Sequence, residues 1–132
     1  MTGLYETFFS TLSGDATLQG LLGASATDKK VYPVWLQGKS SLPAIRVAVS
    51  GVTSDIGLPI DRPVVDVYMA SAISPTQLNS ISARVDYLLN RKRLSGPNGF
   101  VMHICYKVVE QDDFDEATQE YRRVIRYSII SK

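Results

Sequence analysis

The sequence contains few of the residues from which catalytic and metal sites are built. Its 132 residues include one histidine, His103, and one cysteine, Cys105. A zinc site needs several Cys or His ligands at suitable spacing, and this pair has no companions. The two residues also lie two positions apart on one predicted strand, with no orienting group, which is poor geometry for a nucleophilic pair. We expect His103 to be packed or at an interface, Cys105 to be buried, and the chain to have no catalytic residue, cofactor or metal.

The sequence also lacks an excess of either charge and any long apolar segment. Lysine and arginine number 14 against 13 aspartates and glutamates, which gives a formal net charge of +1. No global field therefore draws the chain to nucleic acid or to an anionic membrane. No apolar run approaches the roughly 20 residues that span a bilayer, and Met1 to Glu6 do not begin a signal peptide. Because a single cysteine cannot form an internal disulfide, these absences together predict a soluble protein in a reducing cytoplasm.

A pair of strand patterns lies at the centre of the chain. In residues 44–50 and 63–70, apolar side chains alternate with polar or small ones at the period of two typical of half-buried strands. The stretch between them, Gly51 to Asp61, is rich in Gly, Pro, Ser and Asp and predicts a long exposed loop. A shorter extended segment, Val31 to Trp35, contains a proline that favours a sheet edge, and Trp35 is expected to pack under the loop.

Helical patterns lie on both sides of the central pair. Residues 3–22 carry an apolar stripe that is broken at Gly14, and Asp15 is placed to cap the second part. Residues 75–93 follow a capping serine, with proline at the first helical position and glutamine three residues after the cap. The basic run Arg91 to Arg93 suits the negative end of this helix's dipole.

Two long strand patterns complete the chain. Residues 99–109 and 121–131 alternate apolar and polar side chains, and the acidic stretch Glu110 to Glu120 between them is predicted to be a loop. Helices, strands, a helix and strands follow one another without regular strand-helix-strand repetition, which favours an α+β fold. We predict a single domain over residues 1–132, with a mostly antiparallel sheet of four to five strands and helices packed on one face.

The charged segments have the patterns of ordinary surface. The acidic stretch lacks the ordered ligands and glycine of a calcium loop, and a charge run between strands is usually solvated. The basic run Arg91 to Arg93 is explained by helix capping and has no aromatic platform beside it to bind nucleic acid. Gly20 and Gly23 mark helix ends and do not form a phosphate loop.

Function is therefore expected at surfaces. The two predicted loops are longer than compact hairpins require, and such loops are often functional. The strand faces opposite the expected core carry charges of both signs among apolar residues, which suits a subunit interface and equally suits a solvated sheet face. The predicted subunit or partner contacts are Arg46, Asp66, Lys107, Arg126, Asp55, Asp61, Asp112, Asp113, Asp115 and Glu116. Arg126→Glu is expected to weaken assembly and to leave the monomer folded.

The succession of elements resembles that of a known family, the tail-completion and tail-terminator proteins of long-tailed bacteriophages. The resemblance covers essentially the whole chain and rests on element order, size and a leucine-proline strand entry. Its parts, in order, are a helical start, a Val-x-Pro segment at Val31 to Pro33, the strand entry Leu42 to Val47, a long loop, Val65 to Tyr68, the helix from Ser74 and two final long strands.

The resemblance implies a structural role. Proteins of this family form rings, usually hexamers, that cap the last ring of tail-tube subunits, stop tube elongation and present a surface to the neck of the DNA-filled head. The implied partners are further copies of the chain, the tail tube protein and head-neck connector proteins, with DNA only passing through the ring lumen and no membrane. The implied location is the tail or neck of a virion, and the host cytoplasm during assembly.

Two alternatives stay open at this point. One is a head-completion or neck adaptor protein, which differs in its partner and not in its chemistry. The other is a small enzyme or ligand-binding domain with a site around His103, Tyr106 and the acidic stretch. A deep polar pocket converging on His103 would favour the enzyme, whereas a flat sheet face with mobile loops would favour the virion roles.

Overall fold

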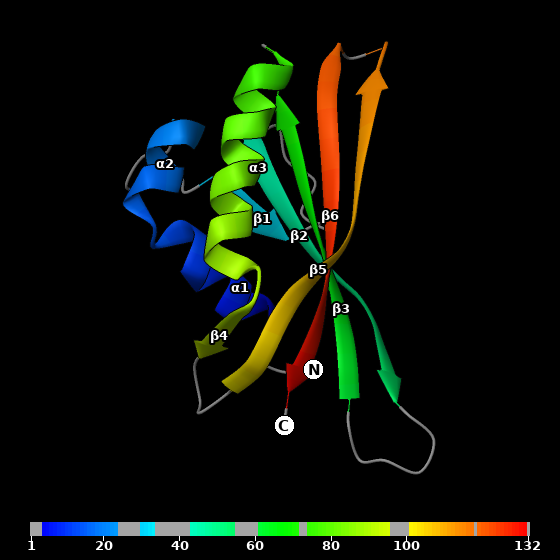
Figure 1. Ribbon diagram of the computed structural model, residues 1–132. Coiled ribbons are helices and arrows are strands. Elements are labelled where there is room, and N and C mark those ends of the chain that lie inside the picture. Colours follow the sequence, from blue (N-terminus) through cyan, green and yellow to red (C-terminus); the bar gives the residue numbers. More distant parts are fainter. Residues whose placement is uncertain are drawn as a thin grey trace.

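A strongly twisted sheet with helices on one face forms the fold (Figure 1). The computed structural model describes residues 4–23, 30–33, 43–54, 61–71, 74–95, 101–117 and 119–131. Over these residues the elements are α1 (Leu4–Ser13), α2 (Ala16–Leu22), β1 (Val31–Pro33), β2 (Ala44–Ser54), β3 (Asp61–Ser71), α3 (Pro75–Leu89), β4 (Lys92–Ser95), β5 (Val101–Asp115) and β6 (Glu120–Ser131).

The described strands form one six-stranded sheet in the order β1-β2-β3-β6-β5-β4. Every neighbouring pair is antiparallel except β1 with β2, which run parallel. The predicted α+β class and mostly antiparallel sheet are confirmed. The sheet has six strands and not four to five, because the short segments β1 and β4 also pair at its edges.

The first two helices are separated at the predicted break, and the second begins at the predicted cap. Asp15 is extended at the N-cap of α2, and its carboxylate accepts a hydrogen bond from the Leu18 amide at 2.8 Å. Gly23 ends α2 in the left-handed conformation, at φ 68°, which glycine adopts at no steric cost. Phe8 and Leu12 of α1 are fully buried, so the predicted apolar stripe does face the core.

Helix α3 begins as predicted and ends earlier. Ser74 is the N-cap and accepts a hydrogen bond from the Gln77 amide, while the Gln77 side chain accepts one from Ser71 Oγ. The helix stops at Leu89, so the prediction of helix to residue 93 is wrong. Arg91 has φ 60° and lies in a turn, and Lys92–Ser95 pair with β5 as β4. The basic run therefore does not cap the helix.

Strands β2 and β3 are longer than their alternation predicts. They pair antiparallel from Ala44 with Ala70 to Ser54 with Asp61, with a bulge between Val49 and Gly51. Much of the predicted loop from Gly51 is therefore strand. The bulge is one extra residue in β2, which shifts the register by one position. The pairing with β3 then continues through Gly51 and the polar residues that follow it. Trp35 and the predicted loop's central residues lie outside the described part of the chain.

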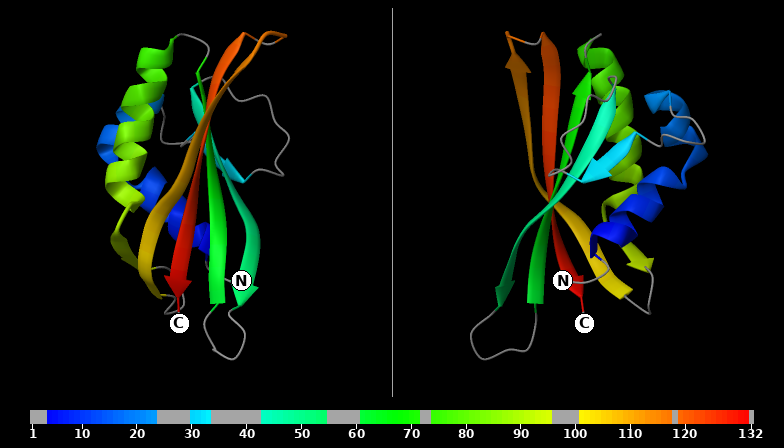
Figure 2. Two further views of the ribbon diagram at one scale, coloured as in Figure 1. Left: turned by 45° about the vertical axis from the view of Figure 1, so that its right-hand side comes forward. Right: turned by 180° about the vertical axis from the view of Figure 1, so that it is seen from behind.

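The helices cover one face of the sheet and not the other. All three helices lie on one side, as the two views in Figure 2 show, and we call this side the helix-covered face. Its side chains build one core in which each fully buried aliphatic residue contributes about 1.5–3 kcal/mol. The sheet residues of this core include Ile45, Val47, Val65, Val67, Met69, Cys105, Ile125, Tyr127 and Ile129. The opposite side, the open face, carries the alternate residues.

Candidate interaction surfaces

The acidic stretch forms the upper part of a long hairpin. β5 runs to Asp115 and β6 starts at Glu120, so the prediction of a loop from residue 110 is wrong. The pairing continues from Val109 opposite Arg126 to Asp115 opposite Glu120. We call residues 108–115 with 120–124 the upper ribbon, and its tip lies on the side of the molecule away from α1 and α2 (Figures 1 and 2). The acidic residues of one strand thus lie opposite the arginine-rich start of the other.

Arg123 joins the upper ribbon to α3. Its guanidinium binds both carboxylate oxygens of Asp112, at 2.6 and 3.0 Å, directly across the strands. It also donates to Ser82 Oγ at 2.6 Å and to Asn79 Oδ1 at 2.8 Å, both on α3. This hydrogen-bonded guanidinium lowers the pKa of Asp112. Asp112 therefore lies on the helix-covered face as a structural partner of Arg123.

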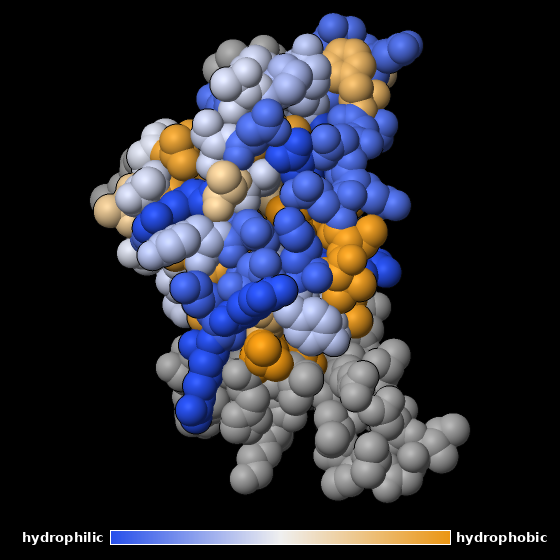
Figure 3. All heavy atoms as spheres, viewed as in Figure 1, coloured by the Kyte–Doolittle hydropathy of each residue, from blue (hydrophilic) through white to orange (hydrophobic). Residues whose placement is uncertain are grey.

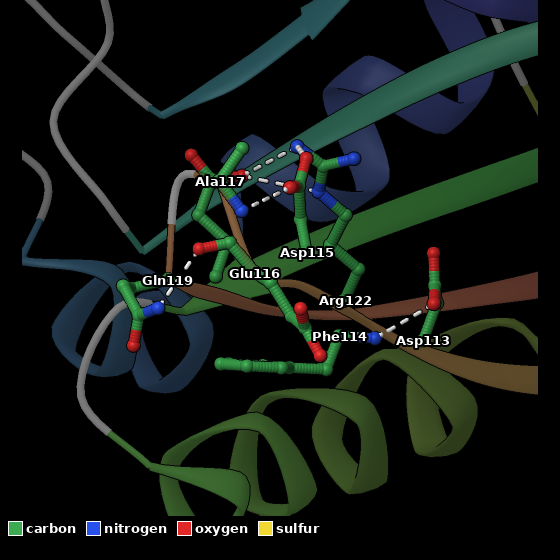
Figure 4. Close-up of polar contacts among 8 residues, drawn as sticks. Asp113, Phe114, Asp115, Glu116, Ala117, Gln119 and Arg122 are labelled. Atoms are coloured by element: carbon green, nitrogen blue, oxygen red, sulfur yellow. Dashed lines mark hydrogen bonds and ion pairs between the residues drawn. The ribbon is translucent and has the colours of Figure 1, made fainter.

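A second arginine organises the ribbon's tip (Figure 4). Arg122 lies 2.9 Å from Asp115 and 3.0 Å from Glu120. Asp115 also accepts the Ala117 amide at 2.9 Å, which fixes the turn. Asp113 accepts the Phe114 amide at 2.8 Å, and the Asp113 and Glu116 side chains are exposed. The tip is thus a mixed-charge turn with two outward carboxylates.

On the open face, Asp66 and Arg126 form a pair that spans two strands. They lie opposite each other in the register of β3 and β6, and two hydrogen bonds of 2.8 and 3.1 Å join them. The Asp66 side chain is only 5% exposed, whereas that of Arg126 is 48% exposed. The bound carboxylate raises the pKa of Arg126.

This pairing changes the expected effect of Arg126→Glu. The substitution would place a second carboxylate against the buried Asp66, and a buried charge left without its partner destabilises a fold. The variant would therefore lower monomer stability, and a loss of assembly could not be assigned to the surface alone.

Lys107 does not join the predicted charged face. It lies opposite Tyr127 on the helix-covered face, and its ammonium is 3.7 Å from Asp86 of α3. The prediction that Lys107 lies on the face opposite the core is therefore wrong, whereas the prediction that Cys105 is buried is confirmed. Cys105 is fully buried, and the bulge at Val108 then shifts the phase of the ribbon above it.

The other predicted contact residues are scattered. Arg46 is half-buried on the open face, opposite Tyr68 and beside Tyr32 of β1. Asp61 begins β3 opposite Ser54, and its side chain is outside the described set, as is Asp55 altogether. The structure thus places Arg46, Asp66 and Arg126 on the open face. Asp112, Asp113, Asp115 and Glu116 lie near one another along the upper ribbon and its turn, with Asp112 on the opposite side of the ribbon from Asp113 and Asp115.

A basic surface at the end of α3 was missed by sequence reasoning. Tyr87 is 61% exposed, with the Arg84 guanidinium 4.7 Å and the Lys92 ammonium 4.9 Å from its ring centre. Arg91 and Arg93, which flank Lys92 in the sequence, are also exposed. We call these five residues the basic corner. The interpretation that the basic run has no aromatic platform is wrong, and the spacing of three between Arg84 and Tyr87 on a helix was the available signal.

Arg84 is held in place from α2. Its guanidinium donates two 2.8 Å hydrogen bonds to the two carboxylate oxygens of Asp15, the N-cap of that helix. This contact lowers the pKa of Asp15 and raises that of Arg84. One carboxylate thus caps α2 and fixes the arginine that lies against Tyr87.

Of the residues considered for catalysis, Cys105 lies in the core, Tyr106 is half-buried and the acidic stretch is mostly exposed. Burial raises the pKa of Cys105 to about 12, so the thiol is the stable form. Burial also raises the pKa of Tyr127, whose hydroxyl is 3.2 Å from Asp86. The His103 side chain is outside the described set. Among the side chains that are described, no three His, Cys, Asp or Glu residues are placed to hold a metal ion.

Apolar side chains are exposed among polar ones. In Figure 3, hydrophilic side chains predominate at the upper right end and over the lower part of the helix, and apolar side chains are exposed at the upper right end and at the right-hand side below it. Ile104, Val108 and Val109 of β5 are 37%, 56% and 39% exposed.

Within the described residues, no helix has the length and apolar character needed to cross a membrane.

Comparison with known proteins gives a likeness in fold. No model of a known protein family matches the sequence, and no curated protein matches it. A chain of the virion of a native gene transfer agent particle superposes with a TM-score of 0.80 at 14% identity, covering 98% of this chain and 94% of that one. A second solved protein superposes with a TM-score of 0.65 at 12% identity, covering 98% of this chain and 93% of its own. The chain therefore resembles, from end to end, a component of a phage-like virion in its fold.

Proposed function

We propose that this chain is a structural virion protein that forms a hexameric ring on the end of a phage tail tube. The ring ends elongation of the tube and joins the tail to the head-neck. The observation that carries the proposal is the nearly complete likeness in fold to a chain from a gene transfer agent virion. The order of elements in the sequence independently resembles the tail-terminator proteins.

The surfaces of the chain are compatible with such a ring. A closed ring of identical subunits needs two different and complementary surfaces on each subunit. The tip of the upper ribbon and the basic corner lie at opposite ends of the molecule and expose opposite charges, and the open face offers a third surface. The tail tube protein and the neck connector proteins are the further partners, and DNA passes through the lumen.

Electron microscopy tests the proposal directly. The purified chain is imaged alone and after mixing with tail tubes assembled from the same genome. Six-fold rings, or density that caps one end of each tube, are expected, and tubes assembled with the chain should stop at one length. Uncapped tubes, with the chain bound to connector particles, would instead favour a neck adaptor. A chain that binds neither would contradict both virion roles and would direct attention to a site near His103.

A further inference from the structure

One edge of the sheet is covered only along its lower half. β4 pairs with β5 from Val101 to Cys105, and the Asn90 side chain accepts the Lys107 amide at 2.9 Å. Above this point, among the described residues, β5 pairs with β6 alone. Unpaired strand edges are sites at which other chains bind, unless they are blocked. The edge from residue 108 to 115 must therefore either bind another chain or be protected from unwanted strand pairing.

The side chains of this edge indicate what partner it accepts. Val108 and Phe114 are 56% and 41% exposed, which gives the edge an apolar component. Glu110, Asp113 and Glu116 are exposed, and their carboxylates make no ion pair with a described residue. An occupant should therefore combine apolar or aromatic surface with positive charge.

The basic corner of the same chain has that chemistry. Tyr87 supplies an exposed aromatic ring, and Arg91 and Arg93 supply charges that make no ion pair with a described residue. Both arginines lie at irregular backbone positions, since Arg91 has a positive φ and Arg93 lies at the bulge between Lys92 and Leu94. Bulges and turns of this kind redirect side chains away from the sheet.

The tip of the upper ribbon cannot reach the basic corner of its own subunit. The lower end of α3 with β4, and the tip of the upper ribbon, lie at opposite ends of the molecule in both sets of views (Figures 1 and 2). We infer that the free edge of the upper ribbon of one copy binds the basic corner of the next copy. This inference rests on the proposed ring and names the contact between its subunits. Charge complementarity fixes the partner as a second copy, because the chain has both halves of the contact and nearly no net charge.

Charge reversal in two places tests the contact. The first variant carries Glu110→Lys and Glu116→Lys, and the second carries Arg91→Glu and Arg93→Glu. None of these side chains forms an ion pair with a described residue, so both variants should keep the wild-type circular dichroism spectrum. At the substituted positions, each variant alone has like charges on the two surfaces. Association measured by analytical ultracentrifugation should weaken about tenfold or more in each.

A mixture of the two variants provides the decisive comparison. In the mixture every contact again joins opposite charges, so association should return, with the two variants in equal amounts. Combining all four substitutions in one chain should also restore association, and this chain should not join wild-type assemblies. Glu6→Lys, a reversal on an exposed residue of α1, is the matched control and should associate like the wild type. Added salt should weaken all the assemblies.

The outcomes separate this contact from the proposed function. Wild-type rings that form equally well from both reversed variants would overturn the contact and leave the ring function standing. A wild type that forms only dimers, with the same pattern of loss and rescue, would support the contact and contradict the ring. Reversals that alter binding to duplex DNA and not self-association would overturn the inference, because the basic corner would then bind nucleic acid. A wild type that stays monomeric up to about 1 mM would also overturn it.

Discussion

Strands β5 and β6 pass through two different environments along their length. In the lower half, Cys105, Tyr127 and Ile129 are fully buried beneath the helices. In the upper ribbon most β5 side chains are exposed, and cross-strand ion pairs such as Arg123 with Asp112 act beside a single aromatic pair, Phe114 with Tyr121. The same two strands are thus held together by different forces.

The two regions differ in how much free energy each contact contributes to folding. Full burial of an aliphatic side chain contributes about 1.5–3 kcal/mol, whereas an exposed ion pair contributes about 0–1 kcal/mol. The lower half therefore decides whether the domain folds. The upper ribbon is held by weaker contacts, so its surface can be changed, or bound by a partner, at little cost to the fold. A subunit that assembles through the upper ribbon needs both a stable core and a projecting surface that can change without unfolding it.

The largest effect should come from removing apolar volume in the lower half. Ile125 is fully buried on the helix-covered face, and Ile125→Ala should lower the free energy of unfolding by about 3 kcal/mol through lost burial and a residual cavity. Urea denaturation measures the change. Val124→Ala alters the next residue, which is half-buried on the open face, and should cost less than about 1 kcal/mol. Equal losses in the two variants would contradict the division of the sheet into a packed and an open face.

Local signals in the sequence were enough to predict most of the helices and the strands packed beneath them. The caps at Asp15 and Ser74 were found because a capping side chain and its amide partner lie within three residues. The apolar alternation of β2 and β3 was found because burial of one face imposes a period of two. What these patterns have in common is that each interaction, or its cause, lies within a few residues along the chain.

The upper ribbon could not be predicted because its stabilising contacts are distant in sequence. Asp112 is typical of a solvated loop when its neighbours are considered, and becomes a strand residue only because Arg123 lies opposite it. Lys107 was placed on the wrong face because both alternating sets of β5 contain apolar residues, and the set with Ile104 was taken to face the core in place of the set with Cys105. The end of α3 was misplaced because Arg91 adopts a left-handed turn conformation that usually selects Gly or Asn.

Acid should loosen the upper ribbon before it unfolds the core. The pKa of Asp112 is lowered in the folded protein by Arg123, so the pair stabilises the ribbon at neutral pH. This contribution is lost as the pH falls below the ordinary value of 3.8 and through the folded pKa. The side chain of Asp112 is 62% exposed, so the effect should be at most about 1 kcal/mol. Amide exchange by NMR, corrected for intrinsic rates, should show faster opening of residues 110–115 at pH 3 than at pH 6.

Arg123→Met provides the control for the acid effect. Without the guanidinium, the pKa of Asp112 is no longer lowered by Arg123, so the opening of the ribbon should depend less on pH, and the remaining dependence comes from the pairs of Arg122 with Asp115 and Glu120. If instead the core residues of β6 lost protection first in the wild type, the ribbon would not be the weaker half.

The smallest effect should be a gain in stability at the ribbon's tip. Gln119 has φ 58°, a conformation that costs an L-residue about 1 kcal/mol and glycine almost nothing. Gln119→Gly removes this cost, but it loses the 2.8 Å hydrogen bond to the Glu116 carbonyl and adds freedom to the unfolded chain. The net gain should be at most about 0.5 kcal/mol, measured as slower local exchange in residues 110–124 with an unchanged global midpoint in urea. Gln119→Ala keeps the unfavourable φ and loses the same hydrogen bond, so it should speed that exchange. A gain with alanine equal to the gain with glycine would show that backbone conformation does not limit the turn, and a shift of the global midpoint would show that the two halves of the hairpin unfold as one unit.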